Sequence, residues 1–346
     1  MNTPAQSAAD RPEETSEGDA PPACVMSFNA SDPSGAGGLA GDISTIAAMG
    51  AHALPVVTSI VMRDTAEVFD SHEIEAETIV EQARSILEDI TIAAWKVGFL
   101  GSAEGVAGVA EVLSDYPDVP LVTYLSSVSW LEEDDQQAYL DALRELILPA
   151  TEVLVGNQQT LIDFLLPEWD GERPPSAREL AVAAGELGAR YVLVTGIALP
   201  AGKGSEAQVD NVLASPQGAI TGEKFERFDA SFVGAGETLA AALASLLASG
   251  QDLHLAVSEA LSFLDQALDA GFRPGMGNVV PDRFSGPCPR PNLAKISKPH
   301  SARRPPTRRP LPTAARAAFT DTLVRPCLSP ATQAFSRGPN AAFPVA

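Results

Sequence analysis

The sequence predicts an α/β protein with a mainly parallel central sheet covered by helices on both faces. Between residues 23 and 286, short apolar runs alternate with amphipathic runs of helical spacing. Repeated strand–helix–strand units require right-handed crossovers and place helices on both faces of a parallel sheet. Hydrophobic residues make up 45% of the chain and aromatic residues only 6%, so we expect a core built mainly from Ala, Leu, Val and Ile.

The predicted elements follow one another in a regular order. The first helix places Leu39, Ile43, Ile46 and Ala47 on one face at helical spacing. In chain order we expect a strand at 23–30, a helix at 38–49, a strand at 53–62, a helix at 77–88, a strand at 92–99, a helix at 104–113, a strand at 120–125, a helix at 136–147, a strand at 152–155, a helix at 177–187, a strand at 191–194, an antiparallel pair at 209–214 and 219–228, and helices at 237–248 and 253–270.

Three segments of different composition divide the chain. Residues 1–22 are rich in Pro, Glu, Ser and Ala and predict a disordered acidic arm. Residues 23–286 form the predicted α/β domain. Residues 287–346 are rich in Pro and carry ten Lys and Arg against a single acid, Asp321, which predicts a disordered basic tail. We expect this tail to contribute nothing to activity; the alternative is a basic arm that docks on the acidic body or on a nucleic acid.

Charge and hydropathy exclude several classes of protein. The net charge of −22 argues against a nucleic-acid-binding surface over most of the molecule. No basic segment leads into an apolar stretch at the N-terminus, and no run of about 18 apolar residues predicts a membrane span. The three cysteines and four histidines have no metal-ligand spacing. We therefore expect a soluble, bacterial-type cytoplasmic protein.

Two glycine-rich turns suggest the chemistry. Asp-Pro-Ser-Gly-Ala-Gly-Gly at 32–38 and Gly-Ala-Gly-Glu-Thr at 234–238 each follow an apolar run and open an Ala-rich, helix-like run. Such a turn brings bare backbone N–H groups to the positive end of a helix dipole, which favours anion binding. Because ligands of parallel sheets bind beyond the carboxyl ends of the strands, a phosphate donor at one turn and an acceptor alcohol at the other would make a small-molecule kinase. No Walker A sequence, G-x-G-x-x-G fingerprint in a strand-to-helix context or G-x-S-x-G elbow is present.

Glu237 in the second turn is a candidate catalytic base. It lies just inside the predicted helix, where it could accept the proton of an attacking hydroxyl group. Gly234 and Gly236 would let backbone N–H groups approach the phosphate without a Cβ in the way. The alternative is an ordinary acid in a first helical turn, with the glycines serving the bend.

The first turn contains further candidates. Asp42 shares a helix face with Gly38 and Ile46, and it could hold an alcohol or the ring nitrogen and amine of a heterocycle. The alternative is a solvated helix acid. Asp32 and Ser34 are expected to satisfy the N–H groups of their own turn.

Four motifs together resemble a known family. They are Asn-Ala-Ser-Asp-Pro-Ser-Gly-Ala-Gly-Gly at 29–38 with Asp42, Ala-Met-Gly-Ala at 48–51 followed by Val-Val-Thr-Ser at 56–59, Lys-Val-Gly-Phe-Leu at 96–100, and Gly-Met-Gly at 275–277 before Phe284. Across residues 23–284 the chain resembles the hydroxymethylpyrimidine/phosphomethylpyrimidine kinases of thiamine biosynthesis, and its second glycine turn is similar to the anion-hole turn of their ribokinase-like superfamily. The first motif is quite specific.

The resemblance implies a ribokinase-like fold, a homodimer and two successive ATP-dependent phosphorylations with Mg²⁺, first of the pyrimidine's hydroxymethyl group and then of the monophosphate. It implies that Glu237 acts as the base beside Gly234 and Gly236, and it leaves the metal ligands unassigned. The implied acceptor-binding residues are Asp42, Arg63, Ala30, Gly37, Phe99 and Leu125. The implied nucleotide-binding residues are Asn157, Thr195, Gly196, Gly234 and Ala235.

Several positions depart from the family pattern. Glu237 stands where the family usually has Cys and its relatives Asp, and Arg63 replaces a substrate-contacting Gln, which would favour a more anionic ligand. Thr123, Thr160 and Thr195 stand where an acid, a Glu and a Lys are expected. Two alternatives therefore stay open: a non-catalytic relative that binds a pyrimidine or nucleotide for regulation or salvage, and a kinase of a pyridoxal-type vitamer.

Overall fold

The computed structural model describes residues 21–199 and 207–284. The predicted basic tail and all but the last two residues of the predicted acidic arm lie outside the described residues. All described residues belong to one compact unit. No helix within the described ranges is both long and apolar enough to cross a membrane.

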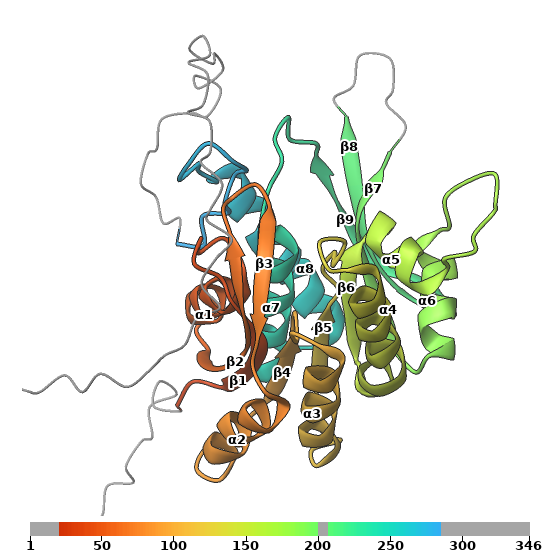
Figure 1. Ribbon diagram of the computed structural model, residues 1–346. Helices are drawn as coiled ribbons and strands as arrows, with labels where there is room; N and C mark the ends of the chain where they lie inside the picture. Colours follow the sequence, from red (N-terminus) through yellow and green to blue (C-terminus); the bar gives the residue numbers. More distant parts are fainter. Residues whose placement is uncertain (1–20, 200–206, 285–346) are drawn as a thin grey trace, which may run out of the picture. The chain divides into compact units, whose positions relative to one another are not determined.

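A nine-stranded sheet forms the centre, in the order β3-β2-β1-β4-β5-β6-β7-β8-β9 (Figure 1). Its middle is parallel, as predicted, because consecutive strands are joined through helices. The parallel strands are β1 (Cys24–Ser31), β2 (His52–Arg63), β4 (Ala94–Val97), β5 (Leu121–Tyr124), β6 (Val153–Asn157) and β7 (Tyr191–Ala198). Antiparallel strands close both edges: β3 (Val68–Glu73) beside β2, and the predicted pair β8 (Gln208–Ser215) and β9 (Gly218–Glu226) beside β7.

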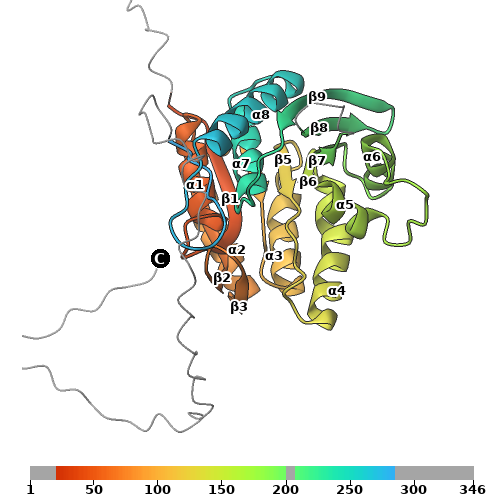
Figure 2. The ribbon, with the colours of Figure 1, turned by 90° about the horizontal axis from the view of Figure 1, so that it is seen from above.

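Helices cover both faces of the sheet, as Figure 2 shows from above. One face carries α2 (Ala76–Leu87), α3 (Ala103–Ser114), α4 (Glu133–Ala142), α5 (Gln158–Leu165) and α6 (Ala177–Glu186). The other face carries α1 (Gly38–Ala48), α7 (Ala235–Ala248) and α8 (Leu253–Asp269). Side chains alternate between the two faces of a strand, so Val25 of β1 belongs to the core under α7 and its neighbour Met26 to the opposite core.

Three elements differ from the sequence prediction. The edge strand β3 was not predicted, because its sequence Val-Phe-Asp-Ser-His-Glu is polar and mostly exposed and gives no apolar run. Helix α5 was also missed, although the Asn157 side chain caps it by accepting a hydrogen bond from the Thr160 N–H. The helix predicted at 136–147 ends earlier and continues as a π-helical turn at Leu143–Ile147 and a 3-10 turn at Leu148–Ala150.

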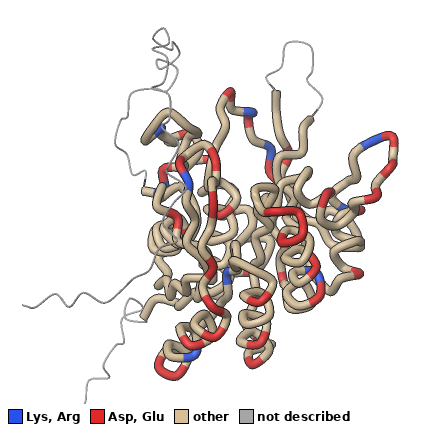
Figure 3. Tube along the Cα trace, viewed as in Figure 1, with Lys and Arg blue, Asp and Glu red and all other residues tan. Residues whose placement is uncertain are grey.

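The described surface is predominantly acidic, in keeping with the negative charge of the chain. Figure 3 shows Asp and Glu spread over the helices and loops, with fewer Lys and Arg among them. Any anionic ligand must therefore be attracted by local groups, such as helix N-termini and individual arginines, rather than by the field of the whole surface.

Candidate active site

The first glycine turn (residues 32–38) joins β1 to α1 and is organised by Asp32. Its Oδ1 accepts hydrogen bonds from the Ser34 N–H at 2.8 Å and the Ser34 hydroxyl at 2.6 Å, and its Oδ2 accepts from the Gly37 N–H at 3.0 Å. The Gly35 and Ala36 amides donate to the Asp32 carbonyl and to Ser34 Oγ. The predicted roles of Asp32 and Ser34 are confirmed. The expectation of bare amides at this turn is wrong, because the chain's own oxygen atoms occupy them.

The second glycine turn (residues 234–238) starts α7, with Gly234 as the N-cap in the left-handed region at φ 81°. No side chain in the described part of the chain caps this helix start. The first amides of α7 and the positive end of its dipole are therefore available to an anion. The two turns touch here: a Cβ on Gly234 would lie 1.8 Å from the Ala36 carbonyl oxygen, and a Cβ on Gly236 would lie 2.4 Å from the Tyr124 ring.

Glu237 reaches from the second turn to the first. Its Oε2 accepts a hydrogen bond from the Gly38 N–H at 2.8 Å, and its Oε1 accepts one from Asn29 Nδ2 at 3.3 Å. A Cβ on Gly37 would lie 1.8 Å from Oε2, so glycine at position 37 leaves the room that the carboxylate needs. The carboxylate thus sits at the start of α1, where the helix dipole also favours negative charge.

Asp42 lies behind Glu237 in a buried polar cluster. Its Oδ2 accepts hydrogen bonds from Ser27 Oγ at 2.7 Å and Asn29 Nδ2 at 2.9 Å. It also pairs with Lys96 Nζ at 2.8 Å, and both side chains of this ion pair are 0% exposed. The alternative of a solvated helix acid is therefore wrong. Asp42 Oδ1 is buried and has no hydrogen-bond partner among the described residues.

The same Asn29 amide group donates to Asp42 and to Glu237, so the two candidate carboxylates are neighbours. Burial raises the pKa of Glu237 above its ordinary 4.5. The charge of Lys96 acts in the opposite direction, and that of Asp42 raises the pKa further. Hydrogen bonds from Gly38 and Asn29 favour the ionised form without reversing the net shift. A carboxylate with a raised pKa is a stronger proton acceptor than an exposed one.

Arg63 and Tyr124 approach the cluster from the ends of β2 and β5. Arg63 Nη1 lies 3.6 Å from Asp32 Oδ2, and the Arg63 side chain is only 15% exposed. The pKa of Tyr124 is raised by burial and by the negative charge of Glu237, and lowered by the positive charge of Arg63. Tyr124 therefore lies within electrostatic reach of both Arg63 and Glu237.

Three more of the predicted acceptor residues have backbone or core roles in this structure. The Ala30 and Phe99 N–H groups both donate to Asn29 Oδ1, at 2.9 and 3.1 Å, which fixes the orientation of the Asn29 amide. The Phe99 ring packs against Trp130, and Leu125 is buried in the same core. These residues adjoin the cluster or lie in the core beneath it.

The predicted nucleotide residues on β6 and β7 form a second group. Asn157 and Thr195 are paired in the parallel register of the two strands, and Gly196 follows in the left-handed region at φ 72°. Thr195 Oγ1 donates to the Gly156 carbonyl at 3.3 Å. Within the described ranges, no hydrogen bond joins this group to Glu237.

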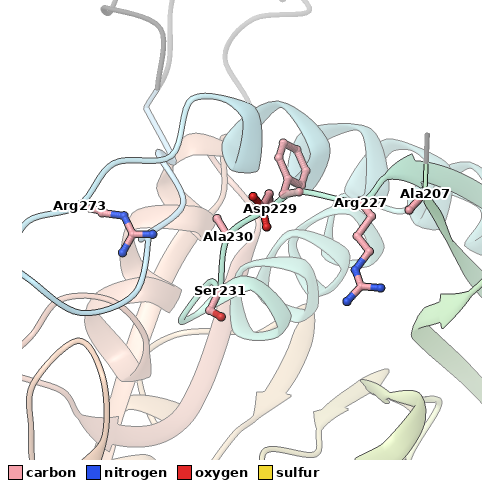
Figure 4. A pocket seen from close by; sticks show the side chains of 7 residues that line it. Ala207, Arg227, Asp229, Ala230, Ser231 and Arg273 are labelled. Carbon is pink, nitrogen blue, oxygen red and sulfur yellow. The ribbon is translucent and has the colours of Figure 1, made fainter. Parts of the chain in front are cut away.

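A hollow of about 670 Å³ lies beside the loop that leads from β9 to Gly234. Figure 4 shows Arg227 and Arg273 at its two sides, with Asp229, Ala230 and Ser231 between them. Neither Glu237 nor Asp42 lines this hollow. We place the candidate chemistry at the contact of the two turns rather than in the hollow, because the interacting carboxylates lie there.

The sequence prediction missed several residues of the cluster. Lys96 carried a recognisable signal, since a lysine inside the apolar strand Ala-Trp-Lys-Val needs a buried partner charge. Asn29 sits in a recognised motif, but its hydrogen bonds with Asp42, Glu237 and Phe99 depend on residues far away in the sequence. Arg283 follows a long irregular segment and gave no signal, yet its guanidinium contacts both turns, donating to Ala36 O at 2.5 Å and to Thr238 Oγ1 at 3.0 Å.

Known proteins resemble this chain over most of its described length. A family model described as phosphomethylpyrimidine kinase matches residues 32–282. The hydroxymethylpyrimidine/phosphomethylpyrimidine kinase of Streptomyces coelicolor is 30% identical over 259 residues, 74% of this chain and 92% of that protein. The enzyme of the same description from Mycobacterium leprae is 31% identical over 265 residues, with the same shares covered. The structure of an ADP complex of Bacillus subtilis pyridoxal kinase matches with a TM-score of 0.66 at 23% identity, covering 75% of this chain and 97% of that one, and shows the common fold.

Proposed function

Because the chain belongs to the phosphomethylpyrimidine kinase family, we propose that it transfers the γ-phosphoryl group of ATP to the hydroxymethyl group of 4-amino-5-hydroxymethyl-2-methylpyrimidine and then to the resulting monophosphate, in thiamine biosynthesis. The observation that carries the mechanism is the shared Asn29 amide, which donates to both Asp42 and Glu237 where the two glycine turns touch. An acceptor bound at Asp42 would lie next to a proton acceptor and next to an uncapped helix start.

Glu237 is the base in this proposal. It is held in place by Gly38 and Asn29, and its raised pKa suits the removal of a proton from an alcohol during transfer. The longer side chain of Glu, compared with the Asp of related kinases, is accommodated by the missing Cβ at Gly37. The first amides of α7, at Ala235 and Gly236, would stabilise charge on the transferred group.

Asp42 holds the acceptor. Its buried Oδ1 lacks a donor among the described residues, and an amine or hydroxyl group of the heterocycle would supply one. Lys96 pairs with this carboxylate at 2.8 Å, and the attraction within the ion pair offsets part of the cost of burying both groups. Arg63, beside Tyr124, would pair with the phosphate of the monophosphate and so favour the second phosphorylation.

The nucleotide is bound by Asn157, Thr195 and Gly196 at the ends of β6 and β7, together with Gly234 and Ala235. Among the described residues no three His, Cys, Asp or Glu side chains converge to hold a metal ion. Thr123, where the family has an acid, is buried and shares a hydrogen bond with Thr151 at 2.9 Å. We therefore infer that Mg²⁺ arrives with ATP and is held mainly by phosphate oxygens and by the several water molecules that this ion usually keeps. We place the reaction in the cytoplasm and expect a homodimer, which analytical ultracentrifugation would test.

The decisive experiment incubates the full chain with ATP, Mg²⁺ and the hydroxymethylpyrimidine, and follows the monophosphate and diphosphate by mass spectrometry. We expect both products, with the monophosphate used more efficiently than the alcohol. Pyridoxal serves as the competing acceptor, and its preferred phosphorylation would overturn the substrate assignment. Binding of the pyrimidine without any product would instead identify a non-catalytic relative.

A further inference from the structure

Arg283 lies beyond α8, in the segment that returns toward the two glycine turns, and its side chain enters the contact between them. The residue is 6% exposed. Its Nη2 donates to the Ala36 carbonyl at 2.5 Å and its Nη1 to the Gly35 carbonyl at 3.4 Å, both in the first turn. Its Nε donates to Thr238 Oγ1 at 3.0 Å, in the second turn. One guanidinium thus binds both turns.

The protein leaves a slot for this guanidinium. A Cβ on Gly41 would lie 3.1 Å from Nη2, and a Cβ on Gly234 would lie 2.9 Å from the same atom. The missing Cβ atoms at Gly41, inside α1, and at Gly234 thus leave room for the close approach of the arginine. A lysine placed here would end in one ammonium group and could not span three acceptors with the geometry of a guanidinium.

Arg283 also acts on the residues that hold Glu237. Thr238 accepts from Arg283 and donates from the same hydroxyl to the Gly234 carbonyl at 2.7 Å, which fixes the first turn of α7 next to Glu237. On the other side, Ala36 immediately precedes Gly37 and Gly38, where the Glu237 carboxylate is received. We propose that Arg283 is a positioning residue, which keeps the two glycine turns in register so that Glu237 reaches the acceptor.

The need for a positive charge does not by itself explain why position 283 is arginine rather than lysine. Burial lowers the pKa of Arg283, while the negative charges of Glu237, Asp42 and Asp32 raise it, so the site needs a cation that stays charged when buried. Arginine meets this need and, unlike lysine, offers five donors in a fixed plane. The three acceptors of Arg283 are neutral oxygen atoms, as expected of a group that fixes backbone geometry.

The test compares Arg283→Lys and Arg283→Ala with the parent protein. Arg144→Met is the matched control, because Arg144 also donates two hydrogen bonds to a backbone carbonyl, that of Phe164, away from the turns. The first readout is amide hydrogen exchange at residues 34–38 and 234–238, which needs no activity. The second is kcat and KM for ATP and pyrimidine, with and without about 20 mM guanidinium, a concentration far below denaturing levels.

We expect faster exchange in both turns of each Arg283 variant, with the rest of the described chain unchanged. In Arg283→Ala we expect kcat to fall about 30- to 100-fold, the effect of losing hydrogen bonds from a charged group. Added guanidinium should restore kcat at least in part, whereas Arg144→Met should keep the parent kcat.

Unchanged exchange in both turns would overturn the proposal, whatever the activity. So would a parent-like kcat in Arg283→Ala. If Arg283→Ala does not fold, Arg283→Lys is judged by the same two criteria. The kinetic readout rests on the proposed kinase function, and the exchange readout does not; an inactive parent protein whose Arg283 variants still loosen both turns would refute the function and leave the positioning role standing.

Discussion

Replacing Glu237 by Gln should remove the proposed base while leaving the structure around it almost unchanged. The Gln oxygen can keep the 2.8 Å hydrogen bond from Gly38. Its amide group would then face Asn29 Nδ2, and the 3.3 Å contact is lost. Asn29 cannot turn over, because its oxygen is held by the Ala30 and Phe99 amides. We expect this rearrangement to cost about 1 kcal/mol, less than a tenfold change in rate.

The loss of the base is expected to be larger. General-base catalysis contributes about 10²- to 10⁴-fold, equivalent to about 2.7–5.5 kcal/mol. We therefore expect Glu237→Gln to lower kcat by at least about 100-fold while the dissociation constant of the pyrimidine, measured by calorimetry, stays close to that of the parent. Glu179→Gln, which removes an exposed acid that caps α6, is the matched control and should be fully active. A fully active Glu237→Gln would refute the assignment of the base.

The pH dependence of kcat tests the same assignment of Glu237 as the base. Burial raises the pKa of Glu237 above 4.5, and only the ionised form accepts a proton. As the pH falls through this raised pKa, the base is protonated and kcat should decline. The decline should therefore begin at a higher pH than an exposed Glu would give, and it should be absent from the residual activity of Glu237→Gln. A decline centred below 4.5, or one that persists unchanged in the variant, would contradict this explanation.

Three further outcomes are expected. Lys96→Met leaves Asp42 buried without its cation and should lower the free energy of unfolding, measured by urea titration, by about 3–5 kcal/mol. Adding Asp42→Asn should recover part of this loss. An unchanged midpoint and slope of the titration would show that the ion pair does not stabilise the fold. Gly37→Ala should displace the Glu237 carboxylate and reduce kcat while the protein stays folded by circular dichroism; parent-like turnover would show that this contact is not needed. Deleting residues 287–346 should leave kcat and KM unchanged, and an inactive truncated protein would assign the tail a role in activity.

Much of the fold could be predicted from the sequence, because the spacing of apolar residues along the chain reflects which side chains are buried. The alternating apolar and amphipathic runs gave the parallel centre of the sheet and the antiparallel pair β8–β9. The edge strand β3 was not predicted, since a strand with one open edge and an exposed surface needs few apolar residues. Helix α5 escaped because it is short and follows β6 without a loop, so that a single Asn both ends the strand and caps the helix.

The candidate site was only partly predictable. Local chemistry identified Asp32 and Ser34 as the residues that stabilise their own turn. The amides at 34–37 are occupied within the turn itself, by oxygen atoms of Asp32 and Ser34. Only the Gly38 amide is occupied from afar, by Glu237 from a segment 199 positions away. The Asn157, Thr195 and Gly196 assignments stay predictions. Residues such as Lys96 and Arg283 gain their roles from partners on other strands and turns, which spacing along the chain does not reveal.

The buried groups around Glu237 have a consequence for the balance of charge. Three cations, Lys96, Arg63 and Arg283, lie among the three acids Asp42, Asp32 and Glu237, so the charges of the resting enclosure sum to zero when every group is ionised. When Glu237 takes up the proton of the acceptor, the acceptor oxygen becomes correspondingly more negative, so this transfer leaves the total charge of the enclosure unchanged. The only charge added to the enclosure is that of the phosphoryl group, and the uncapped first amides of α7 are the groups that offset it in the proposed reaction.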